Sequence, residues 1–395
     1  MKNLLILGAP VFQIEIIQKA KQMGCHVGVV DINPHAPAFS SADETFIASI
    51  TDNEKVLEIA ERFKPDGIMA GACDTAVLTV ANICDKLKLS GISVETAINA
   101  TDKVKMLEAF THMGVAHPHY QVIRKEDLAS TKIEIGYPLI SKPVDSAGGR
   151  GVSIVHCAQQ LHEAMSYSSA AGKSGDVLLE EYMKGPEVSV EIIVEDGVPH
   201  VVQITDKITS GAPNFFEIGH SQPSMLESAV KEKIKSLASA AALAVGLRNS
   251  PAHVEIIVTE EGPKMVELGA RLGSDCITSY LTDISVSGIS MIGSAISLAL
   301  GQKPEIGIIR DSGIASAVRF IPAREGTICS IDGVDNVDCC DGMVHVSVMG
   351  KVGVHYDRAT DDSARFGYVV CKGSTPREAL TCCDEALNKI HITLR

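Results

Sequence analysis

Hydrophobic and polar residues alternate in blocks along the first part of the chain, and these blocks predict strands and helices in turn. The apolar runs NLLILGA, HVGVVDI, TFIAS and DGIMAG are each typical of a buried strand. Apolar residues spaced three or four positions apart predict helices from about Phe12 to Met23, Glu54 to Phe63 and Thr75 to Leu87. Because alternating strands and helices form a parallel sheet covered by helices, residues 1–100 are predicted to form a Rossmann-like domain.

The first strand-to-helix turn, LGAPVFQ, is where a dinucleotide site would lie in such a domain. It has one glycine where the dinucleotide fingerprint has three, and Pro10 and Phe12 crowd the position. We therefore expect a structural domain without a nicotinamide cofactor.

The pattern changes after residue 100. Two hairpins are predicted, EVSVEIIVEDGVPHVVQI with its turn at Asp196-Gly197 and HVEIIVTEEGPKMVELGAR with its turn near Glu261-Gly262. Helices are predicted at about Gln159–Ala170, Glu227–Val245, Ser285–Leu300 and Pro376–Ile390. We expect a central domain over residues 101–305, with a flap subdomain at about 115–185, and a small α+β domain of short strands over 306–395.

Composition and charge exclude several classes of function. The formal net charge of −14 argues against a nucleic-acid partner, since such proteins usually present a basic face. The sequence contains no apolar run of the length, about 18 residues, that a membrane helix needs, and its start reads as a buried strand, not a signal peptide. Eleven cysteines, with adjacent pairs at Cys339/Cys340 and Cys382/Cys383 and no CxxC spacing, predict free thiols of a cytoplasmic protein.

A glycine-rich loop follows an apolar run in the stretch LISKPVDSAGGRGVSIV. Lys142 ends the run, and three glycines fall within the four residues 148–151. Glycines let backbone N–H groups approach a phosphate, but many hairpins turn in the same way. The loop is not a Walker A motif, because the lysine precedes the loop and a strand follows it.

A second lysine stands at the start of a helix in NATDKVKMLEAFTHMG. With Thr101 or Asn99 as the N-cap and Gly114 as the stop, Lys103 and Lys105 fall in the first turn. Positive charge is unfavourable at this end of a helix dipole. Each lysine is therefore either a tolerated surface residue or a group that helps to hold an anion.

Two carboxylates face each other in the hairpin HVEIIVTEEGPKMVELGAR. If the hairpin is symmetric about Glu261, Glu255 lies opposite Glu267. Directly opposed like charges destabilise a sheet unless a cation lies between them, and Mg²⁺ takes one or two carboxylates together with phosphate oxygens. The neighbouring residues, which would point into a core on the other face, are Val254, Ile256, Val266 and Leu268. The alternative is a register shifted by one residue, with one glutamate in solvent.

The intervening segments supply further candidates. In LLEEYMKGPEVSVE, the strand edge at 180–183 can offer backbone groups to an adenine, and Glu187 can reach a ribose hydroxyl. Arg271 follows Glu267 closely, where a guanidinium can bind both oxygens of a planar anion. His220, in the predicted loop NFFEIGHSQPS, is either a substrate contact or a loop histidine with no function.

In this order, these residues resemble the ATP-grasp superfamily, specifically its carboxylate–amine ligases of the amino-acid-ligase, phosphoribosylglycinamide-synthetase and biotin-carboxylase types. The resemblance covers most of the chain and implies ATP and Mg²⁺ (with Mn²⁺ as an alternative) as cofactors. It implies a small carboxylic acid, an amino acid being the expected class, activated as an acyl phosphate and joined to an amine. It also favours a homodimer.

The resemblance also assigns roles to residues. Lys103 and Lys142 would contact ATP phosphates beneath a mobile flap from Asp145 to Gly151, and Arg271 would face the acyl phosphate or the substrate, with His220 as a further candidate. The implied metal ligands are Glu255 and Glu267. The implied nucleotide-binding residues are Ser146, Gly148, Gly149, Gly151, Glu180, Glu181, Tyr182, Met183 and Glu187.

One position departs from the family pattern. The family commonly has Glu-x-Asn-x-Arg at the second metal ligand, whereas this chain has Gly269 in place of the asparagine. A water or another residue would have to supply the missing oxygen. Bicarbonate activation, phosphoribosylamine–glycine ligation, and a nucleotide-binding regulatory module without catalysis remain the alternatives to an acid–amine ligase.

Overall fold

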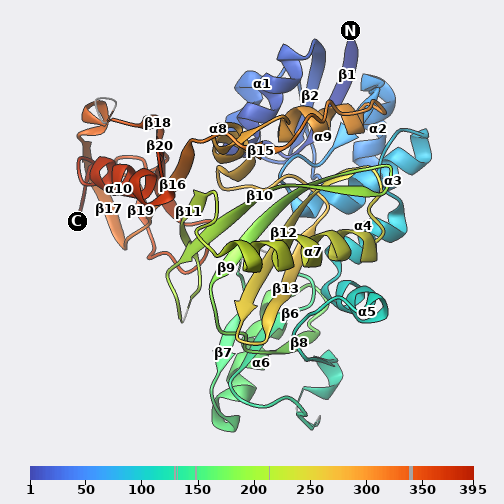
Figure 1. Cartoon of the computed structure of the whole chain (residues 1–395), viewed down its shortest axis with the longest axis vertical. Coiled ribbons are helices and arrows are strands. Elements are labelled where there is room, and N and C mark those ends of the chain that lie inside the picture. Colours follow the sequence, from blue (N-terminus) through green and yellow to red (C-terminus); the bar gives the residue numbers. More distant parts are fainter. Residues whose placement is uncertain (129, 131, 147–148, 213, 338–340) are drawn as a thin grey trace.

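The computed structural model describes residues 1–128, 130, 132–146, 149–212, 214–337 and 341–395. Figure 1 shows the N-terminal part at the top, a subdomain of strands and one helix at the bottom, and the C-terminal part at the left. The mixed α/β and α+β organisation predicted from the sequence is confirmed.

The N-terminal domain is built on a parallel sheet in the order β3-β2-β1-β4. The apolar runs form its strands because both faces of the sheet are covered, and Leu4 to Leu7 are fully buried. The elements of this domain are β1 (Lys2–Leu7), α1 (Ile14–Gln22), β2 (Cys25–Asp31), β3 (Glu44–Ile47), α2 (Asn53–Phe63), β4 (Gly67–Met69), α3 (Val77–Leu87) and α4 (Val94–Thr101). The Rossmann-like prediction is confirmed.

The subdomain at the bottom of Figure 1, which we call the lid, is an antiparallel sheet in the order β5-β8-β6-β7. Apolar residues such as Leu139 and Leu179 pack with helix α6 in a small core, whereas Leu178 of the same sheet belongs to the main core. The lid elements are β5 (Tyr120–Ile123), β6 (Leu139–Pro143), β7 (Ser153–Val155), α6 (Ala158–Ala171) and β8 (Val177–Glu181).

An eight-stranded antiparallel sheet runs through the rest of the molecule in the order β13-β12-β9-β10-β11-β16-β20-β18. The C-terminal strands continue the same sheet, because β11 pairs with β16 from Gly219↔Arg319 to Gln222↔Ser316. Its strands are β9 (Glu187–Glu195), β10 (Val198–Thr209), β11 (Glu217–Gln222), β12 (Ser250–Thr259), β13 (Gly262–Gly269), β16 (Ala315–Pro322), β18 (Met343–Val348) and β20 (Arg365–Gly373).

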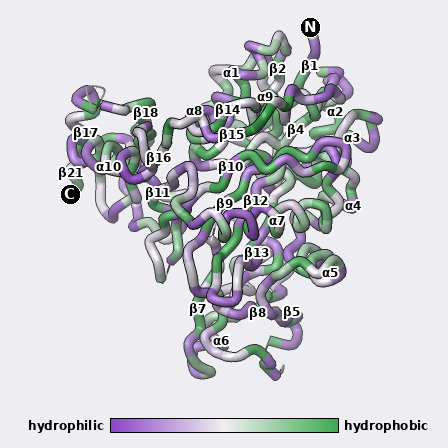
Figure 2. The backbone as a smooth tube through the Cα atoms, viewed as in Figure 1, coloured by the Kyte–Doolittle hydropathy of each residue, from purple (hydrophilic) through white to green (hydrophobic). Residues whose placement is uncertain are grey.

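Helices cover this sheet on both sides. Helix α9 is buried between the N-terminal sheet and the central sheet, and its hydrophobic colour in Figure 2 agrees with this position. The remaining elements are α5 (Lys103–Met113), α7 (Ser228–Ala244), α8 (Thr282–Ser285), β14 (Val286–Ser287), α9 (Met291–Ala299), β15 (Arg310–Asp311), β17 (Gly326–Asp332), β19 (His355–Tyr356), α10 (Pro376–Leu387) and β21 (His391–Leu394). Among the described residues, no helix has the length and hydropathy that a membrane crossing requires.

Three local predictions need correction. The N-cap of α5 is Asp102, whose carboxylate accepts from the backbone N–H groups of Val104 and Lys105, and not Thr101 or Asn99. The helix expected from Ser285 begins at Met291. The segment EIGHSQ is strand β11 and not a loop, because its polar side chains are buried against other polar groups, such as Gln222 Nε2 on Thr205 Oγ1 at 2.8 Å.

Candidate active site

A cavity of about 520 Å³ lies between the lid and the hairpin β12–β13. Its lining includes most of the residues selected from the sequence, namely Lys103, Lys142, Ser146, Gly149, Glu180, Glu181, Tyr182, Met183, Glu187, Glu255 and Glu267. Gly148 lies outside the described residues. Gly151 has a positive φ of 77° and packs against Pro143 and Ala171, away from the cavity lining.

The two glutamates of the hairpin are direct partners, with Glu255 opposite Glu267 across the antiparallel pair. The hairpin is not symmetric, however, because its turn lies at 260–261 and a β-bulge intervenes between Glu255 and Ile256. The bulge adds Val266 to one strand and restores the pairing that symmetry about Glu261 predicts.

The bulge also moves one side chain to the other face. Val254, Ile256 and Leu268 point into the core as predicted, but Val266 lines the cavity and Met265 takes its place in the core. Val266 therefore gives the cavity an apolar wall beside Ile257.

Two lysines from different elements bind carboxylates of the cavity. Lys103 Nζ lies 2.6 Å from Glu267 Oε2, and Lys142 Nζ lies 2.6 Å from Glu180 Oε2. Burial opposes the charge on Lys103, but Glu267 outweighs it and raises the lysine pKa. Lys105, in contrast, is an exposed residue paired with Glu108, so the surface alternative holds for it.

A third lysine, Lys207, lies among carboxylates that line the cavity. Lys207 Nζ, on β10, lies 2.7 Å from Glu187, 3.0 Å from Glu217 and 3.0 Å from Glu255. Burial raises the pKa of the Glu187 carboxyl even against the attraction of Lys207. For Glu217 and Glu255, burial acts in the same direction, but Lys207 and neighbouring groups outweigh it and hold the pKa below its usual range.

His253 connects the metal-ligand candidate Glu255 to a deeper carboxylate. Its Nδ1 lies 2.6 Å from Glu191 Oε1, and its Nε2 lies 3.3 Å from Glu255 Oε1. Burial opposes the charged ring, but Glu191 outweighs it and raises the pKa of His253 to about 9. His253 and Glu191 were not selected from the sequence, although the two-residue spacing places His253 on the same face of β12 as Glu255.

Arg271 and His220 are not part of the cavity lining. The guanidinium of Arg271 binds Asp74 of the N-terminal domain through Nε to Oδ1 at 2.8 Å and Nη2 to Oδ2 at 2.7 Å. His220 is fully buried, and its Nε2 lies 2.9 Å from Glu217 Oε2. His220 thus reaches the cavity only through Glu217.

The C-terminal part contributes two residues that no sequence pattern indicated. Asp362 lines the cavity and accepts from the backbone N–H of Glu217 at 2.7 Å. Arg365 donates to Asp275 at 2.5 Å and to Asp362 at 3.1 Å, and its guanidinium lies 3.8 Å from the centre of the Phe320 ring. A long-range contact of this kind has no signature in local spacing.

The Asp362 carboxyl should make stability depend on pH. Burial, with repulsion from Glu217, raises its pKa to about 7 against the attraction of Arg365. Since the unfolded value is about 3.9, the folded state binds the extra proton, and stability should fall as pH rises from about 4 to about 7. We expect the loss of stability with rising pH to be about 2 kcal/mol smaller in Asp362→Asn, a figure reduced for the partial solvent exposure of the carboxyl. Urea unfolding at pH 5 and pH 8 measures the difference. Equal differences from wild type at both pH values would contradict it.

The donor set of the cavity fits a magnesium–nucleotide ligand. Glu255 and Glu267 offer carboxylate oxygens, the ligands that Mg²⁺ prefers, and Lys103 and Lys207 show that cations are stable against them. Glu180 Oε1 is buried without a hydrogen-bond partner in the described part of the chain, so a donor such as the adenine amino group would satisfy it.

Comparison with known proteins agrees with this geometry. Residues 135–279 match the ATP-grasp domain, and residues 319–395 match the L-amino acid ligase C-terminal domain 2. Residues 135–279 thus form an ATP-grasp domain.

Three known proteins illustrate what the chain is similar to. The alanine–anticapsin ligase of Bacillus subtilis (strain 168) is 30% identical over 242 residues, which are 55% of this chain and 51% of that protein, so the match spans about half of the relative. The crystal structure of an L-amino acid ligase from Bacillus licheniformis superposes with a TM-score of 0.88 at 24% identity, covering 100% of this chain and 99% of that one. Phosphoribosylglycinamide synthetase from Anaerococcus prevotii gives 0.79 at 24% identity, covering 100% of both chains.

Proposed function

We propose that this protein is an ATP- and Mg²⁺-dependent ligase that activates a small carboxylic acid, with an amino acid as the expected class, and couples it to an amine. The products are an amide, ADP and phosphate. The observation that carries the proposal is the pairing of Glu255 with Glu267 at the floor of a cavity whose walls present Lys103 and Lys142. The match of the C-terminal part to an L-amino acid ligase domain supports the amino acid as substrate class.

The lining of the cavity offers groups for both the base and the phosphates of ATP. Ile140, Ile257 and Val266 offer apolar surface to an adenine ring, next to the strand end at Glu181. Lys142, the fourth of the five residues of strand β6, comes shortly before the glycine loop and would bind phosphate oxygens. The carboxylate of Asp145 accepts from the backbone N–H groups of Lys173 and Ser174, which anchors the base of that loop.

The reaction would then proceed in two steps. A carboxylate oxygen of the acid attacks the γ-phosphorus and ADP leaves, which gives an acyl phosphate; the amine next attacks the acyl carbon and phosphate leaves. Mg²⁺, when bound with ATP, neutralises charge on the phosphates. The lysines of the cavity stabilise the negative charge of the transferring group, and closure of the lid excludes water that would hydrolyse the acyl phosphate.

The test is ADP release measured across a panel of amino acids and other small carboxylic acids, each with and without amines. Release that requires an acid together with an amine supports the ligase. Release stimulated by bicarbonate alone, or by glycine with phosphoribosylamine alone, would replace the proposal with one of the alternatives. Tight ATP binding without turnover under any pair would indicate a regulatory module.

Lys142→Ala should raise the KM for ATP by about tenfold or more, because a charge-assisted contact to a phosphate is lost. Lys105→Ala is the matched control, since Lys105 is exposed and pairs with Glu108. Steady-state ADP release at varied ATP concentration measures both. An unchanged KM in Lys142→Ala would remove this lysine from the phosphate site.

A further inference from the structure

A turn of the N-terminal domain is fastened to the end of strand β13. Asp74 lies in this turn, after β4, and binds Arg271 at two points, 2.8 Å from Nε and 2.7 Å from Nη2. The same turn accepts a backbone hydrogen bond from Leu272, whose N–H lies 3.1 Å from the carbonyl oxygen of Gly71. Two independent contacts therefore set the position of this turn against residues 271–272.

Gly269 is the position that leaves room for this contact. A Cβ atom at Gly269 would lie 2.6 Å from Asp74 Oδ1 and 3.1 Å from Arg271 Nε, and the first distance is too short for any side chain. Gly269 follows Glu267 by two residues on β13, so its missing side chain would project on the same face as Glu267. The Asp74 carboxylate thus occupies space that a side chain at position 269 would need from its first atom onward.

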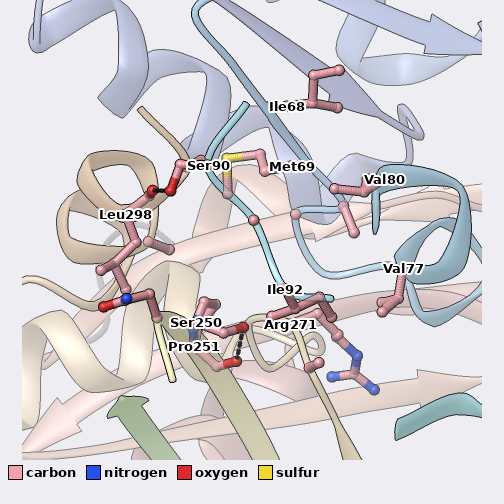
Figure 3. Close-up of a pocket in the computed structure, with 17 residues that line it drawn as sticks. Ile68, Met69, Val77, Val80, Ser90, Ile92, Ser250, Pro251, Arg271 and Leu298 are labelled. Carbon is pink, nitrogen blue, oxygen red and sulfur yellow. Dashed lines mark hydrogen bonds between the residues drawn. The ribbon is translucent and has the colours of Figure 1, made fainter. Parts of the chain in front are cut away.

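The buried side chain of Arg271 borders a small cavity. Behind it lies an apolar cavity of about 60 Å³ between the N-terminal domain, helix α9 and strand β12. Figure 3 shows Arg271 at one side of this cavity, with Ile68 and Met69 on the other. The ion pair with Asp74 and the bond from Nη1 to the Leu272 carbonyl oxygen hold the guanidinium.

The ion pair leaves part of the guanidinium available. An arginine has five N–H donors. Asp74 takes two of those of Arg271, and the Leu272 carbonyl oxygen takes one at 3.0 Å. Within the described residues, the other donors have no partner and can bind an anion.

We propose that Asp74 is a positioning residue that replaces the side chain absent at Gly269 and holds Arg271 so that its remaining donors face the carboxyl group of the acid substrate. The inference rests on the proposed function for the identity of that substrate. It makes the N-terminal domain part of the acid-binding site, although that domain contributes no residue to the lining of the nucleotide cavity.

The experiment tests whether an asparagine at position 269 can take over the role of Asp74. Asp74→Ala should raise the KM for the acid by about tenfold to a hundredfold, because a misplaced binding group loses orientation, and it should leave the KM for ATP unchanged. Gly269→Asn should lower the Tm and the activity, because its side chain collides with Asp74. The double variant Asp74→Ala/Gly269→Asn should recover both properties to near wild type, since the asparagine then has room and can accept from Arg271. Asp74→Asn, which keeps the size and one acceptor oxygen, should fall between wild type and Asp74→Ala.

The readouts separate the possible failures. Tm values of wild type, Asp74→Ala, Gly269→Asn and the double variant test the shared space without any substrate, and additive losses in the double variant would overturn the proposal. A recovered Tm together with an unchanged KM for the acid in Asp74→Ala and Asp74→Asn would also overturn it, because Asp74 would then serve stability alone. If wild type releases no ADP with any acid, the proposed function fails, and the Tm cycle still decides whether Asp74 replaces a side chain at position 269.

Discussion

Glu267→Gln should abolish ADP release while the protein remains folded. The carboxylate of Glu267 is one of two acidic oxygen donors opposed across the hairpin, and it also holds Lys103 at 2.6 Å. An amide keeps the shape but removes the negative charge that a magnesium–triphosphate needs. The expected loss is about a hundredfold or more, as for removal of a single preorganised electrostatic group in an active site.

The same hairpin offers a matched control for this prediction. Glu261 lies at the turn, is 78% exposed and pairs only with Lys264 among the described residues. Glu261→Gln should therefore keep wild-type turnover, and the Tm of both variants should stay within a few degrees of wild type. Full activity of Glu267→Gln with Mg²⁺ would exclude Glu267 from the site and would remove the main support of the proposed function.

Lys207→Met should cause the largest loss of stability. The lysine is 5% exposed and pairs with three carboxylates, so its removal leaves Glu187, Glu217 and Glu255 close together without their shared cation. Breaking a buried charge network in this way costs about 3–5 kcal/mol. Urea unfolding at pH 7 measures the change.

The pH dependence of this loss follows from the same contacts. Lys207 holds the pKa of Glu217 and Glu255 below the usual range against burial, so wild type keeps the stabilisation above the unfolded value and loses it as pH falls. Without Lys207, burial raises these pKa values, and the variant should lose stability as pH rises. The difference between the two proteins should therefore grow from pH 4 to pH 7. Lys184→Met, an exposed lysine of the same cavity, should show no such trend, and a difference independent of pH would contradict the assignment.

The sequence predicted those parts of the site that depend on local geometry. The pairing of Glu255 with Glu267 followed from the facing positions of a hairpin, and Lys103 was noticed because a cation is unfavourable in the first turn of a helix. The register was correct in spite of a wrong turn, because the bulge at Val266 compensated for the shift. The exchange of Val266 for Met265 in the core shows the limit of this reasoning, since two adjacent apolar residues do not reveal which of them faces the core.

The parts that the sequence did not predict depend on contacts between distant segments. Asp74 reaches Arg271 across 197 residues, and Asp362 reaches Glu217 across 145. Strand β11 was taken for a loop because its buried residues are polar; Gln222, for example, satisfies its hydrogen bonds with Thr205 and Ser285 inside the protein. In the sequence alone, a buried strand with polar side chains has the same pattern as an exposed loop.

The continuity of the central sheet has a consequence for the dependence of one part of the chain on another. Because β16 forms the neighbour of β11, a shortened chain that ended before Ala315 would expose the backbone groups of β11 as a bare edge, open to pairing with other molecules. It would also deprive Glu217 of the acceptor at its backbone N–H, which Asp362 supplies. The C-terminal segment is thus an integral part of the central sheet, and its loss would alter the part of the cavity that Glu217 and Asp362 line.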